Sequence, residues 1–298
     1  MAARRAESFT KRSIKSASKA RGLRMAMGMV DLTTLEGKDT AQKVDALCHK
    51  ARFPCMVPAG VEPVPSVAAV CVYPTLVRRA KECLAGTGIK VASVATGFPS
   101  GQYPLDVRLR DCREAVEAGA DEVDMVISRG LFLEGRLDQV ATEVQETRKA
   151  CGRVHLKIIL ETGELETLDA VRRASDLVMS AASRVPGLPA LHDGEVFIKT
   201  STGKVQPAAT MPVTLVMLEA IRDHWLATGV RMGMKPAGGI RTSKQALAYL
   251  VMVKETLGDE WLTPSLFRFG ASALANDLAR QILRMARGNY AAAYDPTE

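Results

Sequence analysis

Charged side chains interrupt several strand-length, otherwise apolar runs of this chain. Asp124 lies within EVDMV and Lys157 within LKIIL, while Lys199 ends VFIK and Lys235 ends MGMK. A lysine or aspartate inside an apolar strand is costly unless it is paired or neutral. A salt bridge, or a lysine that reaches solvent, could explain any one of them. Four such residues on neighbouring strands favour a chemical site.

Amine chemistry explains why two of these lysines could be needed together. An ordinary lysine, with a pKa of about 10.4, is neutral in roughly one molecule per thousand near pH 7.4, and only the neutral amine attacks a carbonyl carbon. A second ammonium close by, in an interior that excludes water, lowers that pKa. We therefore expect Lys199 to be a nucleophile and Lys235 the perturbing cation, with Asp124 moving protons.

Glycine-rich segments follow the last two strands and suggest a phosphate site. The run PAGGIR covers residues 236–241, and Gly270 opens GAS. Adjacent glycines let the backbone approach an anion closely, and barrels commonly bind phosphate in the loops after strands seven and eight. One Gly-Gly pair alone is as consistent with a plain turn, but two such loops indicate a phosphorylated substrate.

Eight strand-helix units can position these residues. We predict strands at 27–32, 67–72, 90–95, 122–127, 155–160, 196–199, 231–235 and 266–269. The predicted helices are 41–51, 75–84, 105–118, 136–150, 166–180, 212–226, 244–255 and 273–285. Strands that are apolar nearly throughout, alternating with helices, are typical of a parallel sheet with both faces covered. Eight units in one chain, with no GxGxxG motif, favour an α/β fold of the (β/α)8 TIM-barrel type over a dinucleotide-binding fold.

The domain organisation follows from charge and loop composition. We expect a basic N-terminal extension at 1–24, a single barrel domain at 25–288 and a C-terminal tail at 289–298. The net charge of +7 comes from the extension, which holds eight basic residues and one acid, so the remainder is balanced. The extension is interpreted as solvated or loosely helical; an organelle-targeting peptide and a nucleic-acid arm are the alternatives. The Pro- and Gly-rich segment 184–195 is expected to be a loop on the face opposite the site.

Cysteine and histidine usage indicates neither a disulfide framework nor a metal centre. The six cysteines form no CxxC pair, and the four histidines form no HxH or HExxH cluster. We interpret the cysteines as reduced thiols of a cytoplasmic protein and expect no protein-bound metal. The longest apolar runs have strand length, so a membrane span is not expected.

Several strings together resemble the deoxyribose-phosphate aldolase family. They cover most of residues 25–288 in the right order, and strings at successive strand ends are highly specific: DLTTL, VASVATGFPSGQ, EVDMVI, LKIILETGEL, FIKTSTGK, KPAGGIRT and FGAS. The resemblance implies a cofactor-free, Schiff-base-forming carbon–carbon lyase of deoxyribonucleotide catabolism. It would reversibly cleave 2-deoxy-D-ribose 5-phosphate to acetaldehyde and D-glyceraldehyde 3-phosphate. It also implies a homo-oligomer, a dimer or tetramer, with no nucleic-acid or membrane partner.

The resemblance assigns a role to each matching position. Lys199 would form the Schiff base, Lys235 would be the second catalytic lysine and Asp124 the proton relay. Contacts to substrate, or support of the lysine network, would come from Asp31, Thr33, Lys157, Thr202 and Lys204. The phosphate would be surrounded by Gly203, Gly238, Gly239, Ile240, Arg241, Gly270 and Ser272.

Two departures and two rival functions accompany this assignment. Ala273 stands where some members carry a second Ser, and the chain runs past Tyr290 and Tyr294 where some members end in a tyrosine that reaches the active site. One rival is another Schiff-base sugar-phosphate or keto-acid aldolase on the same barrel. The other is a non-enzymatic barrel that binds phosphorylated metabolites or nucleic acid.

Overall fold

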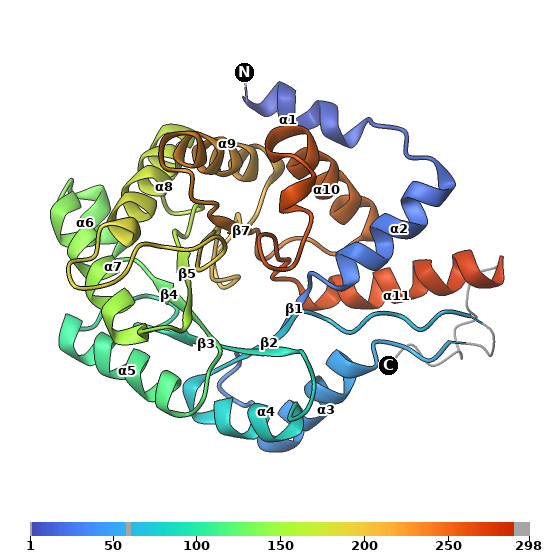
Figure 1. Ribbon diagram of the computed structural model, residues 1–298, viewed down its shortest axis with the longest axis horizontal. Coiled ribbons are helices and arrows are strands. Elements are labelled where there is room, and N and C mark those ends of the chain that lie inside the picture. Colours follow the sequence, from blue (N-terminus) through green and yellow to red (C-terminus); the bar gives the residue numbers. More distant parts are fainter. Residues whose placement is uncertain (1, 58–60, 289–298) are drawn as a thin grey trace.

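The computed structural model describes residues 2–57 and 61–288, so the predicted tail at 289–298 lies outside the described residues. Seven parallel strands form one sheet in chain order (Figure 1). They are β1 Asp31–Thr33, β2 Ala69–Val72, β3 Lys90–Ala95, β4 Glu122–Val126, β5 His155–Ile159, β6 Val196–Lys199 and β7 Gly233–Lys235. A parallel sheet in which each strand pairs with the next curls into a barrel when helices cover its outer face.

An eighth segment, residues 267–270, closes the ring. Phe269 pairs with Val30 just before β1, and Phe267 pairs with Met234 of β7, both in parallel bridges. The N–H of Asp31 donates to the carbonyl of Phe269 at 2.9 Å. The predicted eighth strand is therefore in place, although it forms isolated bridges instead of a continuous strand, and the predicted (β/α)8 barrel is confirmed.

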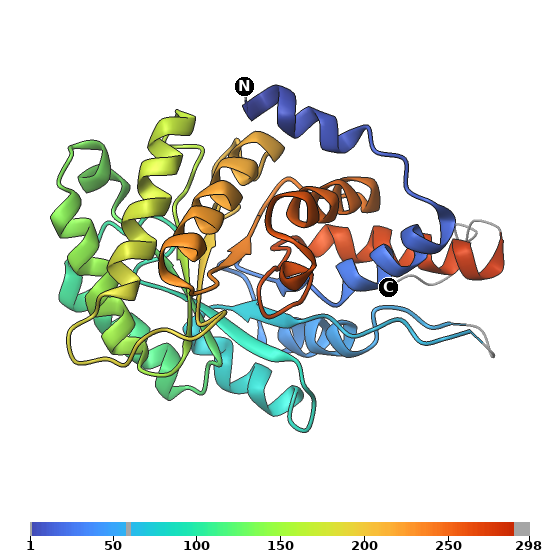
Figure 2. The ribbon, with the colours of Figure 1, turned by 45° about the horizontal axis from the view of Figure 1, so that its top comes forward.

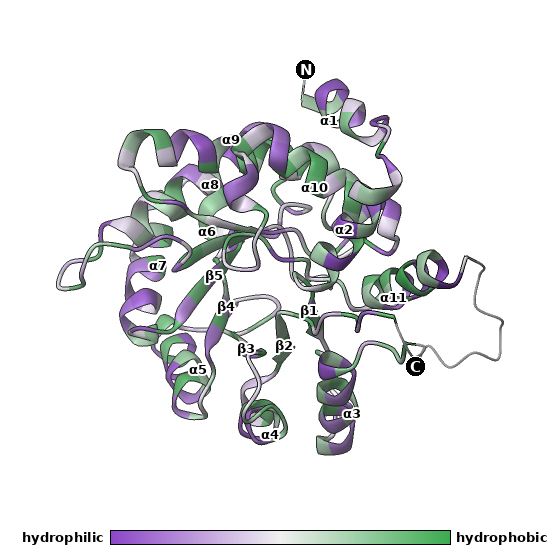
Figure 3. Ribbon diagram, turned by 45° about the vertical axis from the view of Figure 1, so that its right-hand side comes forward, coloured by the Kyte–Doolittle hydropathy of each residue, from purple (hydrophilic) through white to green (hydrophobic). Residues whose placement is uncertain are grey.

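Helices alternate with the strands and surround the barrel (Figures 1 and 2). They are α3 Ala41–Arg52, α4 Val77–Cys83, α5 Leu105–Glu117, α6 Arg129–Leu133, α7 Leu137–Cys151, α8 Leu168–Ser183, α9 Met211–Thr228, α10 Ser243–Leu257 and α11 Ser272–Arg287, with short 3-10 turns η1 Pro74–Leu76 and η2 Asp259–Trp261. Threonines cap four of them, since the hydroxyls of Thr40, Thr167, Thr210 and Thr242 accept from a backbone N–H three residues later. Figure 3 shows hydrophilic and hydrophobic residues alternating along helices such as α3, α7 and α11, as expected for one buried and one solvated face.

The N-terminal extension forms two helices, α1 Ala2–Thr10 and α2 Ser16–Met27, that lie against the barrel. Figure 2 shows α1 beside α9 and α10 at the outside of the molecule. Ala6 and Phe9 of α1 are buried, and Leu23 of α2 has no exposed surface. Arg5 pairs with Glu219 of α9. The predicted helical extension is therefore confirmed, but its helices pack against the barrel.

Most predicted elements are confirmed to within a few residues. The predicted first strand, 27–32, begins too early, because β1 is Asp31–Thr33. Helix α2 continues to Met27, with Gly28 as its C-cap, and β1 starts only at Asp31. The apolar run 25–30 has no alternation that would separate a buried helix end from a buried strand. The segment 184–195 connects α8 to β6 and so lies at the amino ends of the strands, as predicted.

Candidate active site

The predicted catalytic residues converge inside the barrel, from the middle of β4 and the carboxyl ends of β6 and β7. Lys199 is the last residue of β6 and Lys235 the last residue of β7, and the strand register places these two residues directly beside each other. Asp124 is the central residue of β4 and is paired in register with Lys157 of β5. In parallel barrels the carboxyl ends of all strands open on one face, so these side chains share one interior.

Asp124 is the centre of this cluster. Its Oδ2 accepts hydrogen bonds from the Nζ atoms of both Lys199 and Lys235, each at 2.8 Å. Its Oδ1 accepts from Nζ of Lys157 at 2.9 Å. Asp124 and Lys157 have no exposed surface, Lys235 is 1% exposed and Lys199 3%. The two catalytic amines are thus held together inside the barrel, away from bulk solvent.

The two amines differ in their tendency to hold a proton. Burial lowers the pKa of Lys199, and the Lys235 ammonium lowers it further, against the opposing effect of Asp124. Burial also acts against a charge on Lys235, but the carboxylates of Asp124 and Asp31 outweigh it and raise its pKa. The pKa of Asp124 lies well below its ordinary value, because three lysines outweigh the effect of burial. The surroundings therefore favour loss of the proton from Lys199 over loss of the proton from Lys235.

A second layer of charges lies beneath these residues. Asp31 Oδ2 forms an ion pair with Nζ of Lys235 at 2.6 Å, and Glu122 Oε2 accepts a hydrogen bond from Nζ of Lys157 at 2.6 Å. Asp31 was predicted either to contact substrate or to support the lysine network. Its ion pair with Lys235, and its absence from the lining of the cavity described below, fit the second of these roles. Lys157 is fully buried between Glu122 and Asp124 and does not line the cavity described next, so the structure does not bring it to a substrate.

The lysine cavity, of about 370 Å³, opens above the two catalytic amines. Lys199 and Lys235 lie at its base, and six other predicted residues form its walls: Thr33, Thr202, Gly203, Lys204, Gly238 and Gly270. Other wall residues are Thr34, Leu35, Glu36, Lys38, Asp39, Lys43 and Ala237. Lys204 pairs with Glu36 at 2.7 Å across the mouth of the cavity. A cavity of this size accommodates a small substrate.

The predicted phosphate residues fall into two groups. Gly203, Gly238 and Gly270 line the lysine cavity. Gly270 can have no side chain, since a Cβ there would lie 2.7 Å from the Cβ of Ala237. Ser272 lines an adjacent cavity of about 740 Å³ that shares Thr33 with the lysine cavity. Its hydroxyl donates to the carbonyl of Thr33 at 2.9 Å and so joins α11 to β1.

Several expected main-chain donors already have partners. The N–H of Gly238 donates to the carbonyl of Gly270 at 3.0 Å, and the N–H of Arg241 donates to Gln245 at 2.9 Å. Gly239 and Arg241 are not among the residues lining the lysine cavity, and Ile240 is buried. Gly203 has a φ of 82° and open space around its Cα. The structure therefore brings part of the predicted phosphate set to the cavity wall.

Glu161 supports the loop that carries Thr202 and Gly203, a role that the sequence did not reveal. It has no exposed surface and a φ of 53°, and its carboxylate accepts from both the hydroxyl and the N–H of Thr202. Burial raises its pKa, against these hydrogen bonds. Glu122 was also missed. The signal for both was present, since each is an acid at an end of an apolar strand.

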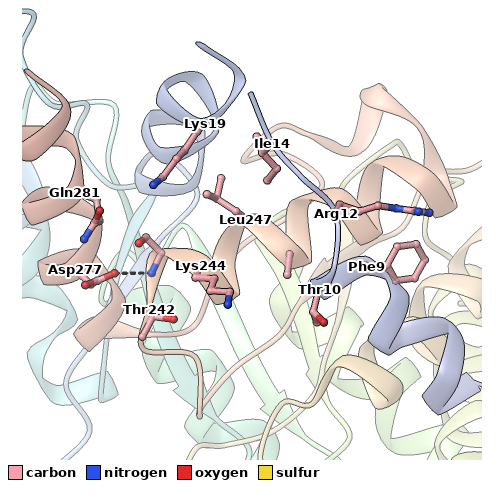
Figure 4. Close-up of a pocket in the computed structure, with 12 residues that line it drawn as sticks. Phe9, Thr10, Arg12, Ile14, Lys19, Thr242, Lys244, Leu247, Asp277 and Gln281 are labelled. Carbon is pink, nitrogen blue, oxygen red and sulfur yellow. Dashed lines mark hydrogen bonds between the residues drawn. The ribbon is translucent and has the colours of Figure 1, made fainter. Parts of the chain in front are cut away.

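The arm cavity, of about 430 Å³, lies between the extension and helices α10 and α11. Figure 4 shows Phe9, Arg12 and Lys19 of the extension around Leu247 of α10. The backbone N–H of Ser243 donates to Asp277 at 2.6 Å on its floor. This cavity contains none of the predicted catalytic residues, so the lysine cavity is the candidate active site.

Two features typical of other functional classes are missing from the described part of the chain. Within residues 2–57 and 61–288, no group of three His, Cys, Asp or Glu side chains is arranged to hold a metal ion. Over the same residues, no helix combines the length and apolarity needed to cross a bilayer.

Comparisons with known proteins identify the family of this chain. The model of the DeoC/LacD aldolase family matches residues 25–280. The mouse protein named deoxyribose-phosphate aldolase is 49% identical, over 98% of this chain and 91% of its own length. The human protein of the same name is 48% identical with the same coverage. The deoxyribose phosphate aldolase structure from Aeropyrum pernix superposes with a TM-score of 0.61 at 20% identity, over 89% of this chain and 97% of that one, and supports the fold alone.

Proposed function

This chain belongs to the DeoC/LacD aldolase family, and from that premise we propose that it reversibly cleaves 2-deoxy-D-ribose 5-phosphate to acetaldehyde and D-glyceraldehyde 3-phosphate. One observation carries the chemistry: Lys199 and Lys235 share one oxygen of Asp124 inside the barrel. A neutral amine beside a charged one is what Schiff-base formation near neutral pH requires.

The roles of the residues follow from their positions. Lys199 adds to the aldehyde carbon of the open-chain sugar, and loss of water gives an iminium. A base removes the proton of the C3 hydroxyl, and the C2–C3 bond breaks as its electron pair enters the iminium to form an enamine. Glyceraldehyde 3-phosphate leaves; the enamine is protonated at C2, and hydrolysis releases acetaldehyde. Asp124 lies within hydrogen-bond distance of Lys199 and is proposed to move these protons, directly or through water.

Substrate binding is proposed to use the walls of the lysine cavity. Gly203, Gly238 and Gly270 allow close approach of a phosphate, and Lys204 provides a cation at the mouth. Thr33 and Thr202 provide hydroxyls in the same cavity. The other members of the predicted phosphate set, Gly239, Ile240, Arg241 and Ser272, are proposed to shape the two loops that carry these contacts.

The setting proposed for the enzyme is cytoplasmic deoxyribonucleotide breakdown, without a cofactor, as a homo-oligomer. Support for a reducing compartment comes from the six free cysteines. We propose no nucleic-acid role for the basic extension. Three of its arginines already pair with acids: Arg5 with Glu219, Arg12 with Glu255 and Arg24 with Glu62.

Borohydride trapping tests this proposal. Reduction in the presence of acetaldehyde should give an irreversible mass adduct on the peptide that contains Lys199, and Lys199→Ala should give none and no turnover. Lys254→Ala is the matched control, because Lys254 lies on the surface in a pair with Asp259. Absence of an adduct in the folded wild-type protein would refute the aldolase. An adduct with a keto acid or dihydroxyacetone phosphate, and none with acetaldehyde, would indicate the rival substrate class.

A further inference from the structure

Arg268 occupies the closing segment of the barrel and is buried, with 5% of its surface exposed. Its guanidinium donates to Asp31 Oδ1 at 2.7 Å and to Glu122 Oε1 at 2.8 Å. A further hydrogen bond from Nε to the carbonyl of Pro264 fixes the side chain. Arg268 does not line the lysine cavity, so any effect on catalysis must pass through its two carboxylate partners.

Those carboxylates are connected to the catalytic amines. Asp31 also binds Lys235, while Glu122 binds Lys157, and both lysines bind Asp124. Lys199 binds Asp124 as well. One continuous set of ion pairs therefore extends from Arg268 to the proposed nucleophile.

Counting the charges of this set shows that one amine is in excess. Three acids, Asp31, Glu122 and Asp124, face three cations: Lys157, Lys235 and Arg268. Two other titratable groups lie beside the network, and burial disfavours the charged form of each. Burial lowers the pKa of His155, whose Nδ1 lies 3.4 Å from Glu122, and burial raises the pKa of the Cys71 thiol to about 11. Lys199 is a fourth cation, and it contacts only one of these carboxylates, Asp124, whereas each of the other three cations contacts two.

We propose that Arg268 is a positioning residue whose fixed charge completes this balance, so that Lys199 is the amine that gives up its proton. The inference rests on the proposed function, in which Lys199 forms the Schiff base. Net charge in a buried, low-dielectric interior is strongly unfavourable, so the surplus amine is the group that loses its charge.

An arginine suits this role better than a fourth lysine. Its guanidinium remains protonated at all accessible pH values, whereas a buried lysine can itself release a proton. Its planar fork also spans two carboxylates from different strands, β1 and β4, which a single ammonium would hold less rigidly. Arg268 therefore sets the charge of the network without competing for the role of nucleophile.

The test compares pH profiles of borohydride trapping by acetaldehyde in three variants. Arg268→Met removes a positive charge, so Lys199 should hold its proton more strongly. We expect the trapping rate near pH 7 to fall about tenfold, as for a one-unit change in pKa, and the deficit to shrink as the pH rises. Glu122→Gln removes a negative charge and should move the acid limb of the profile to lower pH. The double variant Arg268→Met, Glu122→Gln removes one charge of each sign. Its acid limb in the pH profile should therefore lie close to that of the wild-type protein.

A purely structural role gives a different pattern. Arg268→Met would then lose the same factor at every pH, and adding Glu122→Gln would not correct it; either result overturns the inference. Arg268→Lys should restore much of the wild-type profile. If circular dichroism shows that Arg268→Met does not fold, Glu122→Gln and the double variant decide the question. Failure of the proposed function is separate, since the wild-type protein would then give no adduct at any pH.

Discussion

Lys199 and Lys235 bind the same oxygen atom, Oδ2 of Asp124, each at 2.8 Å. This sharing keeps the two nitrogens close together, so the charge on one is felt strongly by the other. Lys235 also pairs with Asp31, and the carboxylates of Asp124 and Asp31 together raise the pKa of Lys235. Because Lys235 has two carboxylate partners and Lys199 has one, Lys235 keeps its proton more strongly than Lys199 does.

Lys235→Leu should depress turnover most severely near neutral pH. Loss of its charge lets Lys199 retain a proton, and each unit of pKa changes the neutral fraction tenfold, so we expect a loss of at least about a hundredfold in kcat/KM at pH 7. Part of the loss should be recovered in alkaline solution. Steady-state measurements of kcat/KM across pH report both the loss and its partial recovery, with Lys254→Leu on the surface as the control. A near-normal rate at pH 7 in Lys235→Leu would contradict the proposed perturbation.

Asp124→Asn keeps the shape of the side chain and removes the charge that three lysines share. Removing a group that transfers protons in the transition state typically costs about 10²–10⁴ in rate. We expect a loss in kcat within that range, measured by single-turnover cleavage. Asp259→Asn, at an exposed pair with Lys254, should leave kcat unchanged. An Asp124→Asn enzyme with more than a tenth of the wild-type kcat would exclude the proton relay.

Gly270→Ala should impair the site through sterics alone. The added Cβ would lie 2.7 Å from the Cβ of Ala237 and 3.1 Å from Cε of Lys235, so the catalytic lysine must shift. Since misplacement of reacting groups by about 1 Å can cost 10²-fold, we expect kcat/KM to fall at least tenfold. Gly88→Ala is the control, because its Cβ would meet nothing within 4 Å. Equal rates in the two variants would show that the close approach at Gly270 has no catalytic consequence.

Phe9→Ala should separate stability from activity. Phe9 belongs to α1 of the extension and is 3% exposed, and it does not line the lysine cavity. Truncation of a buried Phe typically costs about 3–5 kcal/mol, so the free energy of unfolding in urea should drop while turnover per folded molecule is retained. Phe53→Ala, at a position 56% exposed, should change stability little. Loss of turnover in folded Phe9→Ala protein would reveal a link between the extension and the site.

Acid should destabilise the protein through its buried carboxylates. The pKa values of Asp31, Glu122 and Asp124 lie below their ordinary values, because neighbouring cations outweigh burial. Below about pH 4 the unfolded chain binds protons that the folded protein excludes, so stability present above about pH 5 is lost as the pH falls. Urea unfolding at several pH values measures this loss. Glu122→Gln should show a shallower decline, and a free energy of unfolding that stays constant from pH 5 to 3 would contradict the prediction.

The sequence predicted the barrel well because its strands are short, apolar and separated by helix-length segments. The chemical residues were equally visible, since Asp124, Lys199 and Lys235 interrupt apolar runs. Their mutual distances were not visible, because they depend on strand register. Lys157 illustrates the difference: the resemblance assigned it a contact to substrate or support of the lysine network, and its register with Asp124 encloses it between Glu122 and Asp124.

The extension was the least predictable part of the fold. Phe9 and Leu23 do not form an obvious apolar face within 1–24, and the basic residues suggested solvent. Their burial depends on surfaces of α9, α10 and α11 that are distant in sequence. Tertiary contacts of this kind leave no periodic signal in the segment itself.

Docking of the extension also restricts how this barrel can be assembled into larger particles. Helix α1 covers parts of the outer faces of α9 and α10, and the pairs of Arg5 with Glu219 and Arg12 with Glu255 fasten it there. Another copy of the chain cannot contact the surfaces of α9 and α10 that α1 covers while these ion pairs hold the extension in place. Any symmetric contact between subunits must then be built from the remaining helices, or from the strand ends opposite the catalytic mouth.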